Sequence, residues 1–295
     1  MNRRTYAYLA LTVAAALFGM TFVFVKDVLA VIPPLAFVGW RFLIGAVVLL
    51  ALGRPSGRSV WRDGSIAGFV LFIGFAAQTI GLQSTSATNS GLITGLYVVF
   101  TPLIAAIAKR TSPAIATIAG ASMSIVGLGA LTLTQTLTLE TGDVWTLVCA
   151  VAFALHIVIL AYLAPRHKVV PFTAVQLAFV AFAGLALSAL VEGSLSFPPS
   201  EAWPTLIATG LAVTAGAFLI QVWAQTIIGP SRTAIILAIE PLFAVVTAAL
   251  VLGERLSVRG WIGAGLMIAG TYVVLVFAPP EDADIRTAEA ISEAH

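Results

Sequence analysis

The stretch TAIILAIEPLFAVVTAALVLGERL, from Thr233 to Leu256, is apolar and long enough to form a helix that crosses a lipid bilayer. Near its middle, Glu240 puts a carboxylate into the hydrocarbon, at a cost of about 3 kcal/mol. Pro241 follows, and its missing N–H removes a hydrogen bond to the carbonyl of Leu237, which tends to kink a helix. Two costly residues side by side in an apolar helix indicate a role beyond packing.

Composition decides the class of protein. Hydrophobic residues make up 60% of the 295-residue chain and charged residues only 9%, with a mean hydropathy of +1.04. Soluble domains carry about 25% charged residues, so we predict an all-α integral membrane protein solvated by lipid. No basic cluster has interleaved aromatic residues, which argues against a nucleic-acid partner. The single cysteine, Cys149, and three scattered histidines offer neither an intrachain disulfide nor a metal site, and no cofactor is expected.

Apolar runs of about 20 residues, separated by short polar breaks, predict ten transmembrane helices. The first run continues to Val25, longer than a usual signal peptide and without a clear cleavage site, so we interpret it as a helix. The tail 278–295 is polar and acidic, and we expect it to be disordered and cytoplasmic. The ten predicted spans are 5–26, 33–53, 62–82, 86–108, 112–134, 143–163, 171–191, 202–226, 231–252 and 257–277.

The distribution of basic residues predicts the orientation. With the N-terminus in the cytoplasm, most of the 15 Lys and Arg residues fall in cytoplasmic segments, as the positive-inside rule requires. Lys26, Arg255 and Arg259 fall outside, and Arg41 lies within a span. We therefore expect an even number of helices, with both termini cytoplasmic.

The chain also contains an internal repeat, which predicts residues 5–134 and 143–277 as two five-helix units. Because five is odd, the second unit enters the membrane upside down, an arrangement typical of secondary transporters with a binding site near the midplane. Earlier helices match at a shift of 138 residues, with Phe18 on His156. A shift of 143 residues places Gln78 on Gln221, Phe100 on Phe243, Gly120 on Gly263, Gly127 on Gly270, and Tyr97–Val98 on Glu240–Pro241.

The two repeats differ at their centres. Tyr97–Val98 has neither the charge nor the proline of Glu240–Pro241, so we predict no kink at that point of the first repeat. Its own proline, Pro102, comes one turn later and is the predicted kink there.

Several motifs occur in a fixed order in the second half: Gly229-Pro-Ser-Arg-Thr-Ala234, then Glu-Pro-Leu-Phe at 240–243, Leu-Gly-Glu-Arg-Leu at 252–256, and Trp-Ile-Gly at 261–263. With Thr85-Ser-Ala87 and Arg41 in the first half, this order resembles the EamA family of the drug/metabolite transporter superfamily. The resemblance implies a ten-helix bacterial inner-membrane exporter of amino acids, other small metabolites or drugs. The length and the aromatic-rich spans are similar to the aromatic amino-acid exporters of the YddG type.

Two charged residues in the membrane are candidates for the site. Arg41 suits a substrate carboxylate through its bidentate guanidinium, or it ties helix carbonyls or Glu240 in place. Glu240 is a structural partner of Arg41 or of a helix end, a proton carrier, since burial favours the protonated carboxyl, or a contact for a substrate amine. The sequence leaves these alternatives open.

Polar and aromatic residues within the spans complete the candidate cavity. Amides suit either end of a zwitterion, or they join helices by hydrogen bonds, and His156 is a proton carrier or a satisfied core residue. Aromatic rings suit flat apolar substrates, although many face lipid or the core. The cavity candidates are Phe18, Phe22, Trp40, Arg41, Gln78, Tyr97, Phe100, His156, Gln221, Trp223, Gln225 and Glu240.

Glycines and prolines have structural roles in this prediction. Gly120, Gly127, Gly263 and Gly270 let the fifth and tenth helices approach closely, as a packing scaffold or a dimer contact. Pro241 kinks its helix or is merely tolerated there.

The sequence favours a secondary transporter of small organic solutes by alternating access, as a monomer or homodimer in the bilayer. Amino acids, aromatic or neutral, are the favoured cargo, and a multidrug or organic-cation efflux carrier is the alternative. The chain has no P-loop, and it lacks the HExxH or GxSG patterns of an intramembrane enzyme. A channel would show a filter loop or a charged ring, and neither is present.

Overall fold

The computed structural model describes residues 3–112, 114–132, 140–193, 197–237, 239–253 and 255–277, and in these residues it is helical without strands. The predicted tail 278–295 lies outside them. Short 3₁₀ segments, η1 (Ala164–Arg166) and η3 (Ser200–Ala202), and π-helical segments, η2 (Ser188–Glu192) and η4 (Thr209–Ala217), extend the α-helices. The α-helices are α1 (Arg3–Val28), α2 (Pro34–Leu52), α3 (Arg58–Leu82), α4 (Ala87–Thr94), α5 (Tyr97–Ala108), α6 (Ile115–Thr132), α7 (Thr141–Leu163), α8 (Val169–Leu187), α9 (Trp203–Ala208), α10 (Phe218–Gln225), α11 (Pro230–Leu237), α12 (Glu240–Val251) and α13 (Val258–Phe277).

The described chain is a multi-pass membrane protein. Seven of its helical segments are long and apolar enough to cross a bilayer: α1, α2, α3, α4 with α5, α7 with η1, α8 with η2, and the run from η3 to α10. The remaining apolar helices are α6, α11 with α12, and α13. Ten crossings with both termini cytoplasmic therefore stay a prediction.

Two of the predicted spans are broken helices. The span expected at 86–108 consists of α4 and α5, separated at Gly95 and Leu96, and the span expected at 231–252 consists of α11 and α12. All four helices keep the repeat register, because adding 143 to the bounds of α4 and α5 gives those of α11 and α12. The prediction that the first repeat lacks a kink at this point is therefore wrong. Both repeats interrupt the helix just before the equivalent residues Tyr97 and Glu240.

Proline explains the breaks less than the sequence suggested. Pro241 occupies the first turn of α12, where a missing N–H costs little because that N–H has no helical partner. Pro102 lies inside α5, which continues past it to Ala108. At its other end, away from the break, α4 begins with a side-chain cap, in which the Ser86 Oγ accepts the Asn89 N–H at 2.9 Å.

The broken helices cross each other at small residues. A side-chain carbon added at Gly91 would come within 2.5 Å of the Ala244 Cβ, and one at Gly95 within 2.5 Å of the Pro241 Cγ. On the neighbouring helix α1, a carbon at Gly19 would collide with the Glu240 carbonyl oxygen. The α4, α12 and α1 backbones thus touch almost directly, which fixes the centre of the bundle.

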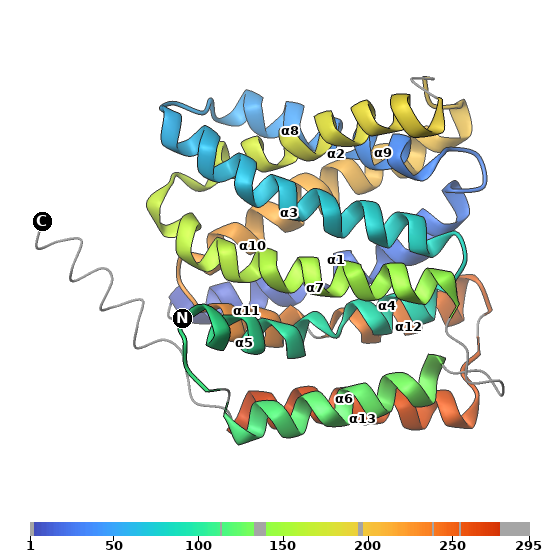
Figure 1. The fold of residues 1–295 in the computed structure, drawn as a ribbon. Coiled ribbons are helices and arrows are strands. Elements are labelled where there is room, and N and C mark those ends of the chain that lie inside the picture. The colour runs from blue at the N-terminus through green and yellow to red at the C-terminus, as the bar shows by residue number, and fades with distance from the viewer. Residues whose placement is uncertain are drawn as a thin grey trace, which may run out of the picture.

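Figure 1 shows α6 and α13 side by side along one edge of the bundle, with α4, α5, α11 and α12 as the next layer and α2, α8 and α9 at the opposite edge. The predicted scaffold glycines, Gly120, Gly127, Gly263 and Gly270, are all buried. A carbon added at Gly270 would lie 2.5 Å from the Gly120 carbonyl oxygen, so the two helices pack backbone to backbone. A dimer contact at these helices stays a prediction.

We predict that Gly91→Ala lowers stability by about 1–3 kcal/mol, because the new methyl group overpacks the crossing of α4 and α12. Gly265→Ala is the matched control, since Gly265 is exposed on α13 with nothing within 4 Å of an added carbon. That control should be neutral or slightly stabilising, as alanine favours helix. Apparent melting temperatures in detergent test both; equal values for the two variants would contradict the close crossing.

Candidate functional site

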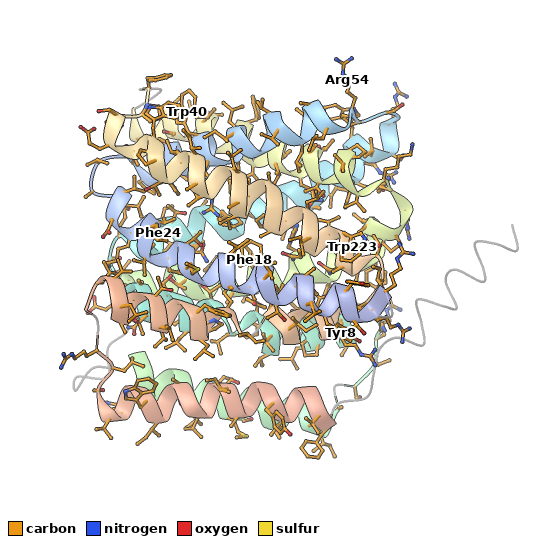
Figure 2. All side chains as sticks on the ribbon, turned by 180° about the vertical axis from the view of Figure 1, so that it is seen from behind. Tyr8, Phe18, Phe24, Trp40, Arg54 and Trp223 are labelled. Carbon is orange, nitrogen blue, oxygen red and sulfur yellow. The ribbon has the colours of Figure 1, made fainter. Side chains whose placement is uncertain are left out.

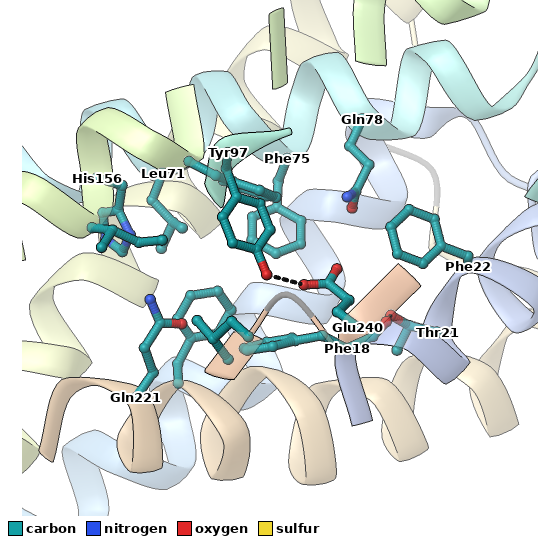
Figure 3. A pocket seen from close by; sticks show the side chains of 14 residues that line it. Phe18, Thr21, Phe22, Leu71, Phe75, Gln78, Tyr97, His156, Gln221 and Glu240 are labelled. Carbon is teal, nitrogen blue, oxygen red and sulfur yellow. Dashed lines mark hydrogen bonds between the residues drawn. The ribbon is translucent and has the colours of Figure 1, made fainter. Parts of the chain in front are cut away.

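A cavity lies at the centre of the bundle, where the helix breaks meet α1, α3, α7 and α10 (Figure 3). Its volume of about 40 Å³ holds a few water molecules. Pockets that bind small organic molecules measure about 300 Å³ or more, so the cavity is too small for such a molecule in this conformation. The lining residues are Phe18, Thr21, Phe22, Leu71, Phe75, Gln78, Tyr97, Phe153, His156, Ile157, Phe218, Gln221, Leu237 and Glu240.

The lining follows the internal repeat. Phe18 and His156 are equivalent at the shift of 138, and three further pairs are equivalent at the shift of 143. Equivalent residues that face one space are what a pseudo-two-fold axis through the cavity produces. The three pairs are Phe75 with Phe218, Gln78 with Gln221, and Tyr97 with Glu240.

Tyr97 and Glu240 contact each other directly. The Tyr97 Oη donates a hydrogen bond to the Glu240 Oε2 at 3.1 Å, and both residues are buried. Each stands first in the helix that follows its break. Glu240 therefore lies at the N-terminus of α12, where the helix dipole favours negative charge. No ion pair joins Glu240 to Arg41 within the described residues, and that interpretation is replaced by the tyrosine contact and the helix end.

Amides lie on opposite sides of this pair, with Gln78 near one end of the cavity and Gln221 near the other (Figure 3). Gln78 donates to the Thr94 hydroxyl and Gln221 to the Gln225 Oε1, both at 3.4 Å. These distances exceed the usual 2.7–3.2 Å for N–H donors, so both bonds are weak and readily exchanged for a ligand.

Besides Tyr97, the wall contains five phenylalanine rings: Phe18, Phe22, Phe75, Phe153 and Phe218. Phe75 contacts three other rings, with its ring centroid 4.8 Å from that of Phe42, 5.0 Å from that of Phe153 and 5.6 Å from that of Phe218. Phe18 meets Phe218 edge to face at 5.1 Å. Such contacts suit a flat apolar guest, which can replace one ring contact by another.

Seven of the twelve cavity candidates line the cavity: Phe18, Phe22, Gln78, Tyr97, His156, Gln221 and Glu240. The His156 Nε2 also contacts the Gln176 Oε1 at 2.9 Å, which satisfies one of its ring nitrogens in the core.

Five candidates lie elsewhere. Trp40 packs against Phe197 and Trp203, away from Phe18 (Figure 2). Gln225 donates to the Ile157 carbonyl at 2.9 Å, while Phe100 and Trp223 pack on the core. Arg41 lies behind the ring of Phe75, with its guanidinium carbon 5.3 Å from the ring centroid.

Sequence reasoning missed seven lining residues: Thr21, Leu71, Phe75, Phe153, Ile157, Phe218 and Leu237. Two of them carried a usable signal, since Phe75 and Phe218 coincide at the shift of 143 that also aligns the glutamines. The other five are ordinary apolar or hydroxyl residues, which nothing in their sequence context sets apart.

Comparisons with known proteins fit this architecture. The EamA-like transporter family matches residues 5–133 and again residues 140–276. The chain belongs to this family. A protein of Archaeoglobus fulgidus named an uncharacterized transporter is 28% identical over 92% of this chain and 86% of its own length. The uncharacterized transporter YetK of Bacillus subtilis is 26% identical over 96% of this chain and 91% of its own.

A solved crystal structure shares the fold of this EamA protein. It superposes with a TM-score of 0.69 at 20% identity and covers 93% of this chain and 98% of its own. The family and the names of the relatives identify a membrane transporter, and they favour a non-enzyme.

We predict that Tyr97 and Glu240 are energetically coupled. Tyr97→Phe and Glu240→Met each remove one partner of a buried hydrogen bond, which costs about 1–3 kcal/mol. Once one partner is gone, loss of the other should cost less, so the double variant is more stable than the sum of the single effects implies. Tyr97→Phe combined with Gln176→Met is the control, because Gln176 is bonded to His156 and not to Tyr97. Melting curves of all variants measure these stability changes. If the stability losses of the Tyr97 and Glu240 variants simply add in the double variant, the contact is contradicted.

Proposed function

We propose that this EamA protein exports amino acids, aromatic or neutral ones first, or related small metabolites, across the bacterial plasma membrane. The observation that carries the proposal is the buried Tyr97–Glu240 pair inside a cavity walled by aromatic rings. A carboxylate offers a partner for a substrate ammonium group, and the rings offer a surface for an apolar side chain.

The proposed mechanism is alternating access between two inverted repeats. The closed cavity must widen to admit an amino acid, because about 40 Å³ leaves room only for water. The breaks before Tyr97 and Glu240 supply hinges, since a few residues at helix ends absorb the change in backbone angles. Two observations support the repeat: the family matches two segments of the chain, and the bounds of the broken helices coincide at the shift of 143 residues. In this proposal ten helices cross the membrane, both termini face the cytoplasm, and the unit is a monomer or homodimer.

A second candidate is efflux of organic cations. One observation favours it: the cavity lining contains the carboxyl group of Glu240 but no lysine or arginine. A cationic drug with an aromatic ring would meet a counter-charge and ring faces suited to cation–π contacts. The two candidates differ in whether the cargo carries a carboxylate.

Purified protein in liposomes tests the proposed function. We expect saturable uptake of labelled phenylalanine or leucine that accelerates when the same amino acid is present inside, which is counterflow. Glu240→Gln and Tyr97→Ala should reduce this flux at least about tenfold, because the first removes the negative charge that meets the substrate ammonium group and the second removes the hydroxyl that donates to that carboxyl group.

The matched controls make the same chemical changes at exposed positions: Glu201→Gln at an end of the bundle and Tyr272→Ala on α13. Both should transport as the unmodified protein does. Flux of organic cations without flux of amino acids would favour the second candidate. Full amino-acid flux in the Glu240 and Tyr97 variants would place the binding site elsewhere.

A further inference from the structure

Arg41 is a buried cation with incomplete bonding. Its side chain on α2 is 3% exposed, and its Nε donates to the Thr214 Oγ1 at 2.8 Å. Its Nη2 is fully buried and has no hydrogen-bond partner. The structure records no ion pair for Arg41 among the residues it describes, although a buried charge is normally paired and bonded throughout. The guanidinium thus has unused capacity for an anion.

The surrounding backbone holds Arg41 in this place. Thr214 belongs to the π-helical segment η4, a form that is uncommon and often marks functional sites. The α2 helix and η4 approach closely at glycines: a carbon added at Gly45 would lie 2.9 Å from the Thr214 Cγ2, and one at Gly210 would lie 3.1 Å from the Arg41 carbonyl oxygen. A bulkier pair of helices could not bring Thr214 to the guanidinium.

One aromatic ring separates Arg41 from the cavity. The guanidinium carbon lies 5.3 Å from the centroid of Phe75, whose side chain also lines the cavity. The guanidinium carbon also lies 5.8 Å from the centroid of the Phe42 ring. These cation–π contacts stabilise the cation while the cavity is closed. They are also replaceable, because an anion interacts more strongly with a guanidinium than a ring face does.

We propose that Arg41 is the carboxylate subsite of the substrate cavity, and that Phe75 covers it until the cavity widens. When the Phe75 ring swings aside, the cavity gains a cation across from the carboxyl group of Glu240. A zwitterionic amino acid then places its ammonium group at Glu240 and Tyr97, its carboxylate at Arg41, and its side chain among the phenylalanines. This inference rests on the proposed function and deepens it: Arg41 makes the site select amino acids over the corresponding amines.

Matched ligands that differ by one charged group test the subsite. Binding to the purified full-length protein is measured by thermal stabilisation with phenylalanine, phenethylamine, which lacks the carboxylate, and hydrocinnamate, which lacks the amine. Leucine and isoamylamine form a second pair. The unmodified protein should bind each amino acid roughly 10- to 100-fold more tightly than its amine, as charged hydrogen bonds contribute. Hydrocinnamate should compete with phenylalanine.

In Arg41→Gln, affinity for the amino acids should fall to that for the amines, and affinity for the amines should stay the same. Arg54→Gln is the control, because Arg54 is exposed and points away from the bundle (Figure 2). Phe75→Trp keeps the arginine and enlarges its cover, so it should also lower the preference for amino acids over amines. This second variant keeps the test decisive if Arg41→Gln does not fold.

Three results would overturn the proposal that Arg41 is the subsite and Phe75 its cover. Equal affinity of the unmodified protein for an amino acid and its amine would do so, and so would an equal loss of both ligands in Arg41→Gln. A preference for amino acids that Phe75→Trp leaves intact would remove Phe75 as the cover. If the unmodified protein transports and binds no amino acid, the proposed function itself fails, and the subsite with it.

Discussion

The fold depends on the rule that backbone N–H and C=O groups in hydrocarbon must be hydrogen-bonded within the protein. A broken helix therefore persists in the membrane only where other helices cover the break. The break before Tyr97 is covered by α12, through Gly95 and Pro241, and the break before Glu240 is covered by α1 at Gly19. Since each break requires the protein interior, both gather at the centre of the bundle, and the cavity forms beside them.

The break also explains why an acidic side chain is tolerated there. The N-terminus of a helix carries a partial positive charge, and Glu240 occupies the first position of α12. It also accepts the Tyr97 hydroxyl, from the equivalent position of the other repeat. The side chain that is most costly for a continuous helix thus lies where a hydroxyl donor and the helix dipole both offset the cost of burying it. Pro241, in the same turn, needs no N–H there.

Much of the architecture could be predicted from the sequence, because long apolar runs and a repeat are strong signals. The register of 143 residues pairs Tyr97 with Glu240, and these two side chains are hydrogen-bonded in the structure. The breaks could not be predicted, since the sequence around Gly95 stays apolar and hydropathy does not distinguish one helix from two. The sequence also does not show which way the Arg41 side chain points. In a helix apolar on every side, periodicity does not show which face meets the cavity.

The repeat pairs in the cavity divide into two kinds, and this division links the fold to chemistry. Phe75 with Phe218 and Gln78 with Gln221 are identical, so they form a symmetric wall that can close on either side of a guest. Tyr97 with Glu240 and Phe18 with His156 differ, so charge and polarity lie unequally about the same axis. The proposed rocking of the two repeats needs the symmetric part, because the inward-open and outward-open states must be similar in energy. Recognition of the proposed amino-acid cargo needs the unequal part, because an amino acid has two different ends. Because only one repeat carries a charged residue in the cavity, the two sides of the cavity differ in charge while the packing of both halves stays alike.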